Sequence, residues 1–214
     1  MDILVLAAHP DDEVLGMGGT IKKLVKQQNK IHLCVVSEGA SAQYDDKKMI
    51  KIRKEACLKS GKILGISTYT FLNFQDMKLD SIPQLEINIE LEKIIKKLKP
   101  KVVYTTPSND LNKDHQKVFE STLVVSRAHG NSVKEVLSYE IPAIIKFAFT
   151  PTVYEDIHKE FPTKIKAFKQ YKTEIMKFPH PRSIEAIETL SKFRGMESGL
   201  IRAEGFQLIK KIQS

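Results

Sequence analysis

A histidine and three carboxylates stand together near the start of the chain, in the segment Ala7-Ala8-His9-Pro10-Asp11-Asp12-Glu13. They follow the continuous apolar run from Ile3 to Ala8, which is typical of a strand buried on both faces. Imidazole nitrogen and carboxylate oxygen are ligands that zinc and its first-row neighbours take in proteins. The alternative is structural, with Asp11 or Asp12 capping the next helix and His9 as an ordinary loop residue. Three adjacent acids after a buried strand are costly unless a cation neutralises them, and this favours a metal site.

A second polar segment, from Ser108 to His115, follows the apolar run from Val102 to Thr106 and ends in Asn112-Lys113-Asp114-His115. In doubly wound sheets the first and fourth strands along the chain are commonly neighbours, so the loops after them face each other. His115 can then complete a His, Asp, His triad that leaves positions open for water and substrate, as a catalytic zinc requires. The alternative is that Asp114 is an N-cap and His115 a solvated residue of the first helical turn.

The glycines at positions 16, 18 and 19 raise a different kind of site, a dinucleotide-binding turn. Glu38, at the end of the next apolar run, also lies where a ribose-binding acid is expected. The spacing is Gly-x-Gly-Gly rather than Gly-x-Gly-x-x-Gly, however. The three carboxylates also occupy the turn in which a pyrophosphate needs bare backbone N–H groups. The segment therefore does not favour a dinucleotide.

Strand-like and helix-like patterns alternate along the first two thirds of the chain, and they must position these polar segments. The patterns predict strands at 3–8, 31–37, 68–72, 102–106 and 136–141, and helices at 20–30, 47–62, 83–99 and 114–129. Such alternation predicts a Rossmann-like, doubly wound α/β fold with a mostly parallel sheet and helices on both faces. Ligands of such folds bind beyond the carboxyl ends of the strands, where His9 and His115 stand.

The last third of the chain follows another pattern. Residues 143–154 are apolar and irregular and predict a strand or an arm, and residues 157–177 and 183–197 predict two helices. No internal repeat, linker or low-complexity stretch divides the chain. We therefore expect one domain over 1–214, with an α/β core over 1–142 and an extension over 143–214 that packs on the same domain.

The composition is that of a globular chain of 214 residues, with 42% hydrophobic and 28% charged residues and no Trp. The formal charge is +8, but only five of the 34 basic residues are Arg, the residue that groove readers and phosphate clamps favour. A solvated lysine surface therefore explains the charge better than a nucleic-acid partner. Cys34 and Cys57 are too few for a disulfide framework, and no targeting segment or membrane span stands out. We expect a cytoplasmic protein with no nucleic-acid or membrane partner.

Several of these motifs together resemble a known family. The segment Ala8-His9-Pro10-Asp11-Asp12-Glu13, the glycines that follow it and the later Asp114-His115 are similar to the LmbE/PIG-L family of zinc-dependent N-deacetylases. Enzymes of that family remove acetyl groups from N-acetylated amino sugars. Weaker similarities extend through most of the chain: Arg53-Lys54-Glu55-Ala56 with Leu64-Gly65, Tyr139-Glu140-Ile141-Pro142, Arg194-Gly195 and Ala203-Glu204-Gly205-Phe206.

The resemblance implies roles for the residues of the first two polar segments. It makes His9, Asp12 and His115 the ligands of Zn²⁺, or of Fe²⁺ or another divalent first-row metal, and it makes Asp11 the general base. Zinc lowers the pKa of its bound water to about 7 and polarises an amide carbonyl. Asp11, next to a ligand, can take the proton of the water and later pass it to the departing amine.

One position departs from the commoner family pattern, which has His where this chain has Asn112. An imidazolium can stabilise an oxyanion and protonate the leaving nitrogen, whereas Asn112 can donate a hydrogen bond but no proton. Asn112 is therefore a catalytic candidate with Asp11 and with Asp114, which orients the histidine in the common pattern. His180 is the free candidate for the missing imidazole, with an ordinary loop histidine between prolines as the alternative.

Five residues are predicted to bind substrate: Arg53, Glu38, Tyr139, His180 and Arg182. Arg53 begins a predicted helix after the loop 37–46, and its guanidinium can bind sugar hydroxyls or an anionic group such as phosphate or carboxylate. The alternative for Arg53 is a surface or salt-bridging role. The same argument for substrate binding applies less strongly to Arg182.

The expected function is removal of an acetyl group from an N-acetylated amino sugar of the N-acetylglucosamine type, or from a conjugate of it. The partner is then a small N-acetylated sugar conjugate, and a homo-oligomer is left open. Two alternatives stay open at this point. One is a metal-dependent amidase or esterase with a non-sugar substrate, and the other is a non-catalytic basic α/β domain that binds a nucleotide or nucleic acid.

Overall fold

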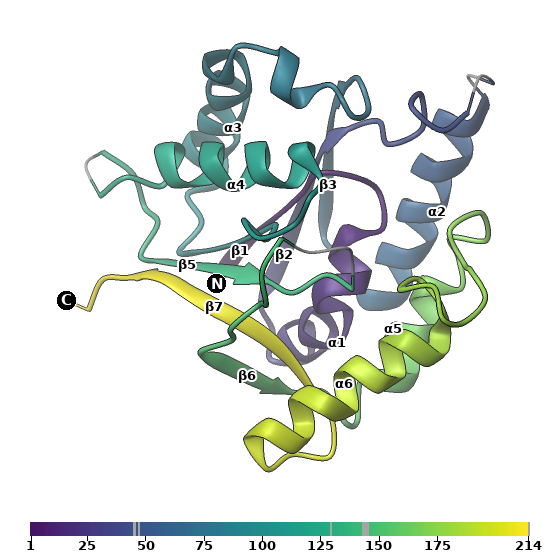
Figure 1. Cartoon of the computed structure of the whole chain (residues 1–214). Helices are drawn as coiled ribbons and strands as arrows, with labels where there is room; N and C mark the ends of the chain where they lie inside the picture. Colours follow the sequence, from purple (N-terminus) through teal and green to yellow (C-terminus); the bar gives the residue numbers. More distant parts are fainter. Residues whose placement is uncertain (45, 47, 129, 143–145, 214) are drawn as a thin grey trace.

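The computed structural model describes residues 1–44, 46, 48–128, 130–142 and 146–213. In this part of the chain seven strands form one sheet in the order β3-β2-β1-β4-β5-β7-β6 (Figure 1). The first five strands in that order pair in parallel, and β7 pairs antiparallel with both β5 and β6. The strands are β1 (Asp2–Ala7), β2 (Lys30–Ser37), β3 (Thr68–Phe74), β4 (Val102–Thr105), β5 (Glu135–Tyr139), β6 (Val153–Asp156) and β7 (Ala203–Lys211).

Helices cover both faces of the sheet, and β1, an interior strand between β2 and β4, packs against both layers (Figure 1). One face meets α1 (Asp12–Lys26), α2 (Lys48–Leu64) and α5 (Phe161–Phe168). The other face meets α3 (Gln84–Leu98) and α4 (Lys113–Val125). A strand sends successive side chains to opposite faces, which is why β1 needs an unbroken apolar run.

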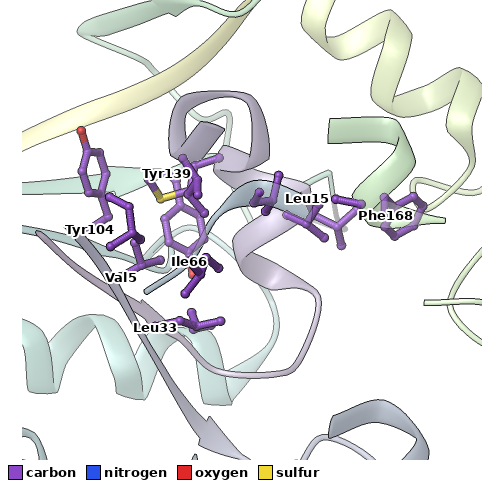
Figure 2. Close-up of a cluster of buried hydrophobic side chains, with 14 of the residues drawn as sticks. Val5, Leu15, Leu33, Ile66, Tyr104, Tyr139 and Phe168 are labelled. Carbon is purple, nitrogen blue, oxygen red and sulfur yellow. The ribbon is translucent and has the colours of Figure 1, made fainter. Parts of the chain in front are cut away.

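The first of these two cores is large and contains a buried tyrosine. Figure 2 shows side chains from the sheet and from the helices gathered around it. The residues labelled there are Val5, Leu15, Leu33, Ile66, Tyr104, Tyr139 and Phe168. Tyr139 is completely buried, and its hydroxyl donates a hydrogen bond to the carbonyl of Leu6 at 2.8 Å. The core therefore joins β5 to β1 and fixes the edge of the sheet that carries the polar segments.

The predicted doubly wound, mostly parallel α/β fold with helices on both faces is confirmed. The predicted helix at 114–129 ends at Val125, and position 129 lies outside the described residues. Of the segment 143–154, predicted as a strand or an arm, residues 143–145 also lie outside them, and β6 begins at Val153. No helix in the described part of the chain is both long enough and apolar enough to cross a membrane.

Two predictions for the last third need correction. The helix predicted at 157–177 ends at Phe168, and turns follow it, because Tyr171 and Glu174 point into the molecule rather than continuing an amphipathic face. Strand β7 was not predicted, because its residues do not form a continuous apolar run. The second predicted helix is present as α6 (Ile184–Ser198), and a short 3₁₀ helix at Leu79–Ser81 precedes α3.

Helix α1 begins at Asp12, before the predicted 20–30, and it is kinked at Met17. Its glycines allow close packing. A Cβ atom at Gly16 would lie 2.3 Å from the ring of Tyr139, and one at Gly19 would lie 2.7 Å from Ile157. Substituted residues would not fit at either position without movement of the neighbour. The glycine-rich segment thus serves helix packing behind the polar loop.

The C-terminal part of the chain holds the second half of α1. Glu204 of β7 accepts the backbone N–H groups of Gly19 at 3.0 Å and Thr20 at 2.7 Å. Its carboxylate also pairs with buried Lys164 of α5 at 2.7 Å. Because the kink leaves N–H groups without helical partners, the carboxylate acts as a cap from a distant strand. This contact gives the Ala203-Glu204-Gly205-Phe206 motif a structural role.

Candidate active site

His9, Asp12 and His115 lie together at the carboxyl ends of β1 and β4. His9 Nδ1 lies 3.2 Å from His115 Nε2 and 3.6 Å from Asp12 Oδ2, and His115 Nε2 lies 3.3 Å from Asp12 Oδ1. The two histidines are 106 positions apart in the chain. They meet because β1 pairs directly with β4 in parallel, so that the loops after both strands lie at the same edge. We call these three residues the ligand cluster.

The ligand cluster has the donor set of a cation site. Its ligand atoms lie within 4.8 Å of one another, and all three residues are buried. Asp12 Oδ1 is buried without a hydrogen-bond donor among the described residues. A buried carboxylate oxygen in that state is costly unless a cation covers it. The residues therefore fit a divalent metal ion.

The carboxylates around the ligand cluster also stabilise positive charge within it. Burial lowers the pKa of His115, but Asp12 and Asp110 outweigh burial and raise that pKa to about 9. Burial likewise opposes charge on His9, yet the surrounding carboxylates, Asp114 foremost, hold its pKa well above the ordinary value. Burial raises the pKa of Asp12, but the two histidines hold it well below its usual range. The carboxylates around the cluster thus favour positive charge at this place, which a divalent metal ion supplies.

Each histidine is oriented through the ring nitrogen that faces away from the cluster. His115 Nδ1 lies 2.7 Å from Asp110 Oδ2, and His9 Nε2 lies 3.1 Å from Asp114 Oδ2 and 3.2 Å from Asp76 Oδ1. Carboxylates in this position accept the proton of the second nitrogen, fix the tautomer and make the first nitrogen a better ligand. His9, Asp76 and Asp114 are close enough to form another cation group. When His9 binds a metal ion through Nδ1, its proton is on Nε2. Asp76 and Asp114 are therefore better explained as acceptors of that proton than as ligands of another cation.

Asn112 and Asp114, both predicted to be catalytic, organise the loop before α4. Asn112 is the N-cap of α4, and its side-chain oxygen accepts the backbone N–H of Asp114 at 2.8 Å. The carboxylate of Asp114 accepts the N–H groups of Met77 at 2.9 Å and Leu79 at 3.0 Å, in addition to facing His9. These contacts tie the loop after β3 to the ligand cluster. A catalytic role for either residue stays a prediction.

Asp11 lies beside the cluster in a strained backbone conformation. Its φ is 126°, which a residue other than glycine rarely adopts. The side chain is completely buried, and both carboxylate oxygens lack a hydrogen-bond donor among the residues that the structure describes. Burial raises the pKa of Asp11, and the charges of Arg182 and Arg53 oppose that shift. A strained, buried carboxylate without a hydrogen-bond donor is typical of a group held for function.

Arg53 lies under the loop that follows β1 and is only 2% exposed. Its guanidinium donates hydrogen bonds to the carbonyl of Gly39 and, at 2.9 Å, to that of Pro10. These bonds join the loops after β2 and β1. They favour a positioning role for Arg53, and a direct contact with substrate stays a prediction.

Tyr139 and Glu38, also predicted to bind substrate, have structural contacts. Tyr139 is the core residue described above. The carboxylate of Glu38 accepts the backbone N–H groups of Ala40 at 2.7 Å and of Asp76 at 3.2 Å. Glu38 thereby joins the loops after β2 and β3. A substrate contact for either residue stays a prediction.

A cavity of about 240 Å³ opens beside the ligand cluster. It brings predicted residues from both halves of the chain to one place. His180 is exposed there, and its Nδ1 accepts a hydrogen bond from the backbone N–H of Arg182 at 3.1 Å, which leaves Nε2 as the ring nitrogen that can donate. The lining residues are Asp110, Asn112, His115, Ile141, Pro142, His180, Pro181 and Arg182.

Three buried residues of this region were not predicted from the sequence: Asp76, Tyr171 and Glu174. Asp76 follows β3, so the rule that selects residues after strands was a usable signal for it. Tyr171 donates a hydrogen bond to Glu13 at 2.6 Å, and burial raises the pKa of Glu13 to about 8. Tyr171 and Glu174 lie in the turns after α5, where the sequence pattern predicted a continuing helix and no motif marks them.

The contact between Asp110 and His115 leads to a testable expectation. Asp110→Asn removes the carboxylate that accepts the Nδ1 proton, so metal affinity is expected to fall by about 10- to 100-fold. Competition against a chromophoric chelator measures this affinity directly. Glu120→Gln is the matched control, because Glu120 is an exposed carboxylate on α4, the helix that carries His115, and it pairs with Lys117. Equal affinity in Asp110→Asn and the unaltered protein would contradict the orienting role.

Comparison with known proteins agrees with this geometry. Residues 4–126 match the family described as PIG-L: GlcNAc-PI de-N-acetylase. The uncharacterized deacetylase YaiS of Escherichia coli (strain K12) is 32% identical over 180 residues, which make up 80% of this chain and 90% of that protein.

Two solved structures share the fold. The N,N'-diacetylchitobiose deacetylase of Pyrococcus horikoshii has a TM-score of 0.83 at 22% identity, over 98% of this chain and 84% of that chain. GalB, the 4-carboxy-2-hydroxymuconate hydratase of Pseudomonas putida KT2440, has a TM-score of 0.81 at 20% identity, over 100% of this chain and 98% of that chain. Because the second enzyme is named for another reaction, the fold alone does not decide the chemistry. The family match over more than half of the chain, with the identity to YaiS, shows that this chain belongs to the PIG-L family of de-N-acetylases.

Proposed function

We propose that this protein is a zinc-dependent hydrolase that removes the acetyl group from an N-acetylated amino sugar of the N-acetylglucosamine type, or from a conjugate of it. The observation that carries the proposal is the ligand cluster, which has the buried carboxylate of Asp11 next to it in the chain and shares His115 with the lining of the cavity. Two imidazoles and a carboxylate are a usual zinc donor set, and Fe²⁺ also accepts such ligands. The family is one of de-N-acetylases, and the Pyrococcus relative is named for a diacetylated sugar.

His9, Asp12 and His115 would hold the metal ion. When bound, it supplies Lewis acidity, which polarises the amide carbonyl and lowers the pKa of a water to about 7. Asp11 accepts a proton from the water that adds to the carbonyl carbon. As the C–N bond breaks, Asp11 delivers that proton to the nitrogen, and the products are acetate and a free amine. Asp11 suits this task because no hydrogen bond from the described residues occupies its oxygens.

The polar groups of the cavity bind and orient the substrate. Asn112 commits its side-chain oxygen to the helix cap, so its amide nitrogen is the group left to donate to the carbonyl oxygen as negative charge develops. The Nε2–H of His180 and the guanidinium of Arg182 donate to sugar hydroxyls. Because Asn112 brings no titratable proton, Asp11 performs both proton transfers in this proposal.

A second candidate function is hydrolysis of a non-sugar amide or ester. The ligand cluster and Asp11 suit acyl transfer in general, and GalB shows that this fold occurs in an enzyme named for a reaction other than sugar deacetylation. A nucleotide-binding role is disfavoured, because the buried side chains of Asp11, Asp12 and Glu13 occupy the turn in which a pyrophosphate needs bare backbone N–H groups.

Acetate release over a panel of acetylated compounds tests the proposed function. At least one compound among N-acetylglucosamine, diacetylchitobiose and the phosphate and malate conjugates of N-acetylglucosamine is expected to yield equal amounts of acetate and free amine. Activity is expected to disappear with a chelator and to return with zinc. N-acetylated amino acids and acetyl esters are the comparison set. Activity confined to that set would reject the sugar substrate, and full activity in excess chelator would reject the metal.

A further inference from the structure

Four charged side chains form a closed ring beside the ligand cluster: Asp11, Arg53, Glu174 and Arg182. Arg182 Nη1 lies 2.7 Å from Glu174 Oε2, and Arg53 Nε lies 3.5 Å from Glu174 Oε1. The Nη2 atoms of Arg53 and Arg182 lie 3.4 Å and 3.6 Å from Asp11 Oδ2. Positive and negative groups alternate around the ring, and their formal charges sum to zero. Arg182 is the most accessible member, with a side chain 25% exposed at the cavity.

The ring treats the two oxygens of Asp11 differently. Both arginines approach Oδ2, and neither is paired with Oδ1 within the described structure. Arg53 is anchored elsewhere by the carbonyls of Gly39 and Pro10. The guanidinium of Arg182 has its shortest ion-pair contact with Glu174 instead. Glu174 is therefore the group that keeps Arg182 from closing on Asp11.

A guanidinium released beside a carboxylate forms a bidentate pair, in which two N–H groups occupy both oxygens. In the absence of Glu174, the buried Arg53 and the partly exposed Arg182 would face the single carboxylate of Asp11. Arg182 would then move from 3.6 Å into direct contact. An uncompensated buried charge drives such a closure strongly. Oδ1 of Asp11 would no longer be open to a water molecule.

We propose that Glu174 is a positioning residue for the hydrolysis. It holds Arg182 on the cavity side of the ring, so that Asp11 keeps one oxygen unpaired for the proton transfers. This inference rests on the proposed function, because it acts through Asp11 as the base. This role also gives a reason for the buried carboxylate of Glu174, which reaches this edge of the sheet from the turns after α5.

Glu174→Gln tests this role, because Gln keeps the size of the side chain and removes its charge. We expect kcat for acetate release to fall by roughly 10- to 100-fold, as when a reacting group is misplaced by up to about 1 Å. The zinc content is expected to stay unchanged. Glu160→Gln is the matched control, since Glu160 is also buried and pairs at 2.7 Å with Lys26, the last residue of α1, at the end of that helix away from the ligand cluster. That variant is expected to keep its kcat.

Adding Arg182→Gln to Glu174→Gln separates positioning from mere stabilisation. The double variant returns the ring to neutrality, so its kcat is expected to exceed that of Glu174→Gln, while its KM stays raised as in Arg182→Gln alone. A purely structural role predicts that the losses multiply. Multiplied losses, or an unchanged kcat in Glu174→Gln, would overturn the proposal.

Two further results keep the test decisive. Should Glu174→Gln not fold, Glu174→Asp keeps the charge and shortens the side chain by one methylene group. It is expected to lower kcat at constant KM, and an unchanged kcat would overturn the proposal. The proposed function fails in a different way, since the unaltered protein loaded with zinc would then release no acetate from any sugar in the panel.

Discussion

Replacement of Asp11 by Asn is expected to lower kcat by about 10²- to 10⁴-fold, which is the usual contribution of a general base. Asn has the same shape and tolerates unusual backbone conformations better than most residues, so it fits the strained φ of 126°. It accepts no proton, however. The zinc content is expected to stay the same, because Asp11 lies beside the ligand cluster without being part of it.

Steady-state kinetics of acetate release and elemental analysis of the same preparation measure both parts of this expectation. Asp80→Asn is the control, because Asp80 is an exposed carboxylate in the 3₁₀ helix before α3. A near-normal kcat in Asp11→Asn would mean that another group takes the proton. Loss of metal from that variant would instead make Asp11 a ligand.

His115→Ala is expected to abolish both metal binding and activity. The variant removes one of three ligands and leaves Asp12 Oδ1 without its neighbour at 3.3 Å. Protein purified without chelator is expected to carry about one zinc or iron ion per chain, and His115→Ala close to none. His158→Ala is the control, because His158 is exposed and lies outside the cluster. A metal-free protein with full activity would reject the metal site altogether.

The same site predicts how metal affinity changes with pH. A metal ion binds neutral imidazole, whereas the carboxylates raise the pKa of His115 to about 9 and that of His9 well above its ordinary value. Binding near neutral pH must therefore displace protons from both rings. Affinity is expected to rise with pH through the neutral range and to level off only once both His9 and His115 are neutral. Zinc titrations at several pH values, with proton release followed in a weak buffer, measure this dependence.

Much of the ligand cluster could be predicted from the sequence, because each of its members lies in a short segment directly after a recognisable strand. His9 and Asp12 are three positions apart, immediately after a strand whose apolar run is unmistakable. The rule that loops after neighbouring parallel strands meet then brought in His115 from the fourth strand. The structure places these residues together through the pairing of β1 with β4. Their role as metal ligands stays a prediction that the variants above test.

The surroundings of the cluster were less accessible, because burial and pairing depend on contacts between distant segments. Arginine is a residue type that often binds substrate, yet two backbone carbonyls and the ring of charges hold Arg53 inside the molecule. Tyr139 is likewise held in the core by a contact with a distant segment, the hydrogen bond from its hydroxyl to the carbonyl of Leu6. Helical periodicity over 157–177 did not reveal that the chain turns after Phe168 and sends Tyr171 and Glu174 inward.

The sequence by itself determined the parallel α/β architecture and the meeting of His9, Asp12 and His115 at one edge of the sheet, because strand periodicity and strand-end motifs are written in consecutive residues. Only the tertiary structure decided which carboxylates orient His9 and His115, and which oxygen of Asp11 stays unpaired. Those outcomes depend on distances of a few ångströms between side chains from the loops after β1, β3 and β4, from α2 and α4, and from the turns after α5. Electrostatic interactions of buried groups change strongly over such distances, and no spacing along the chain encodes them.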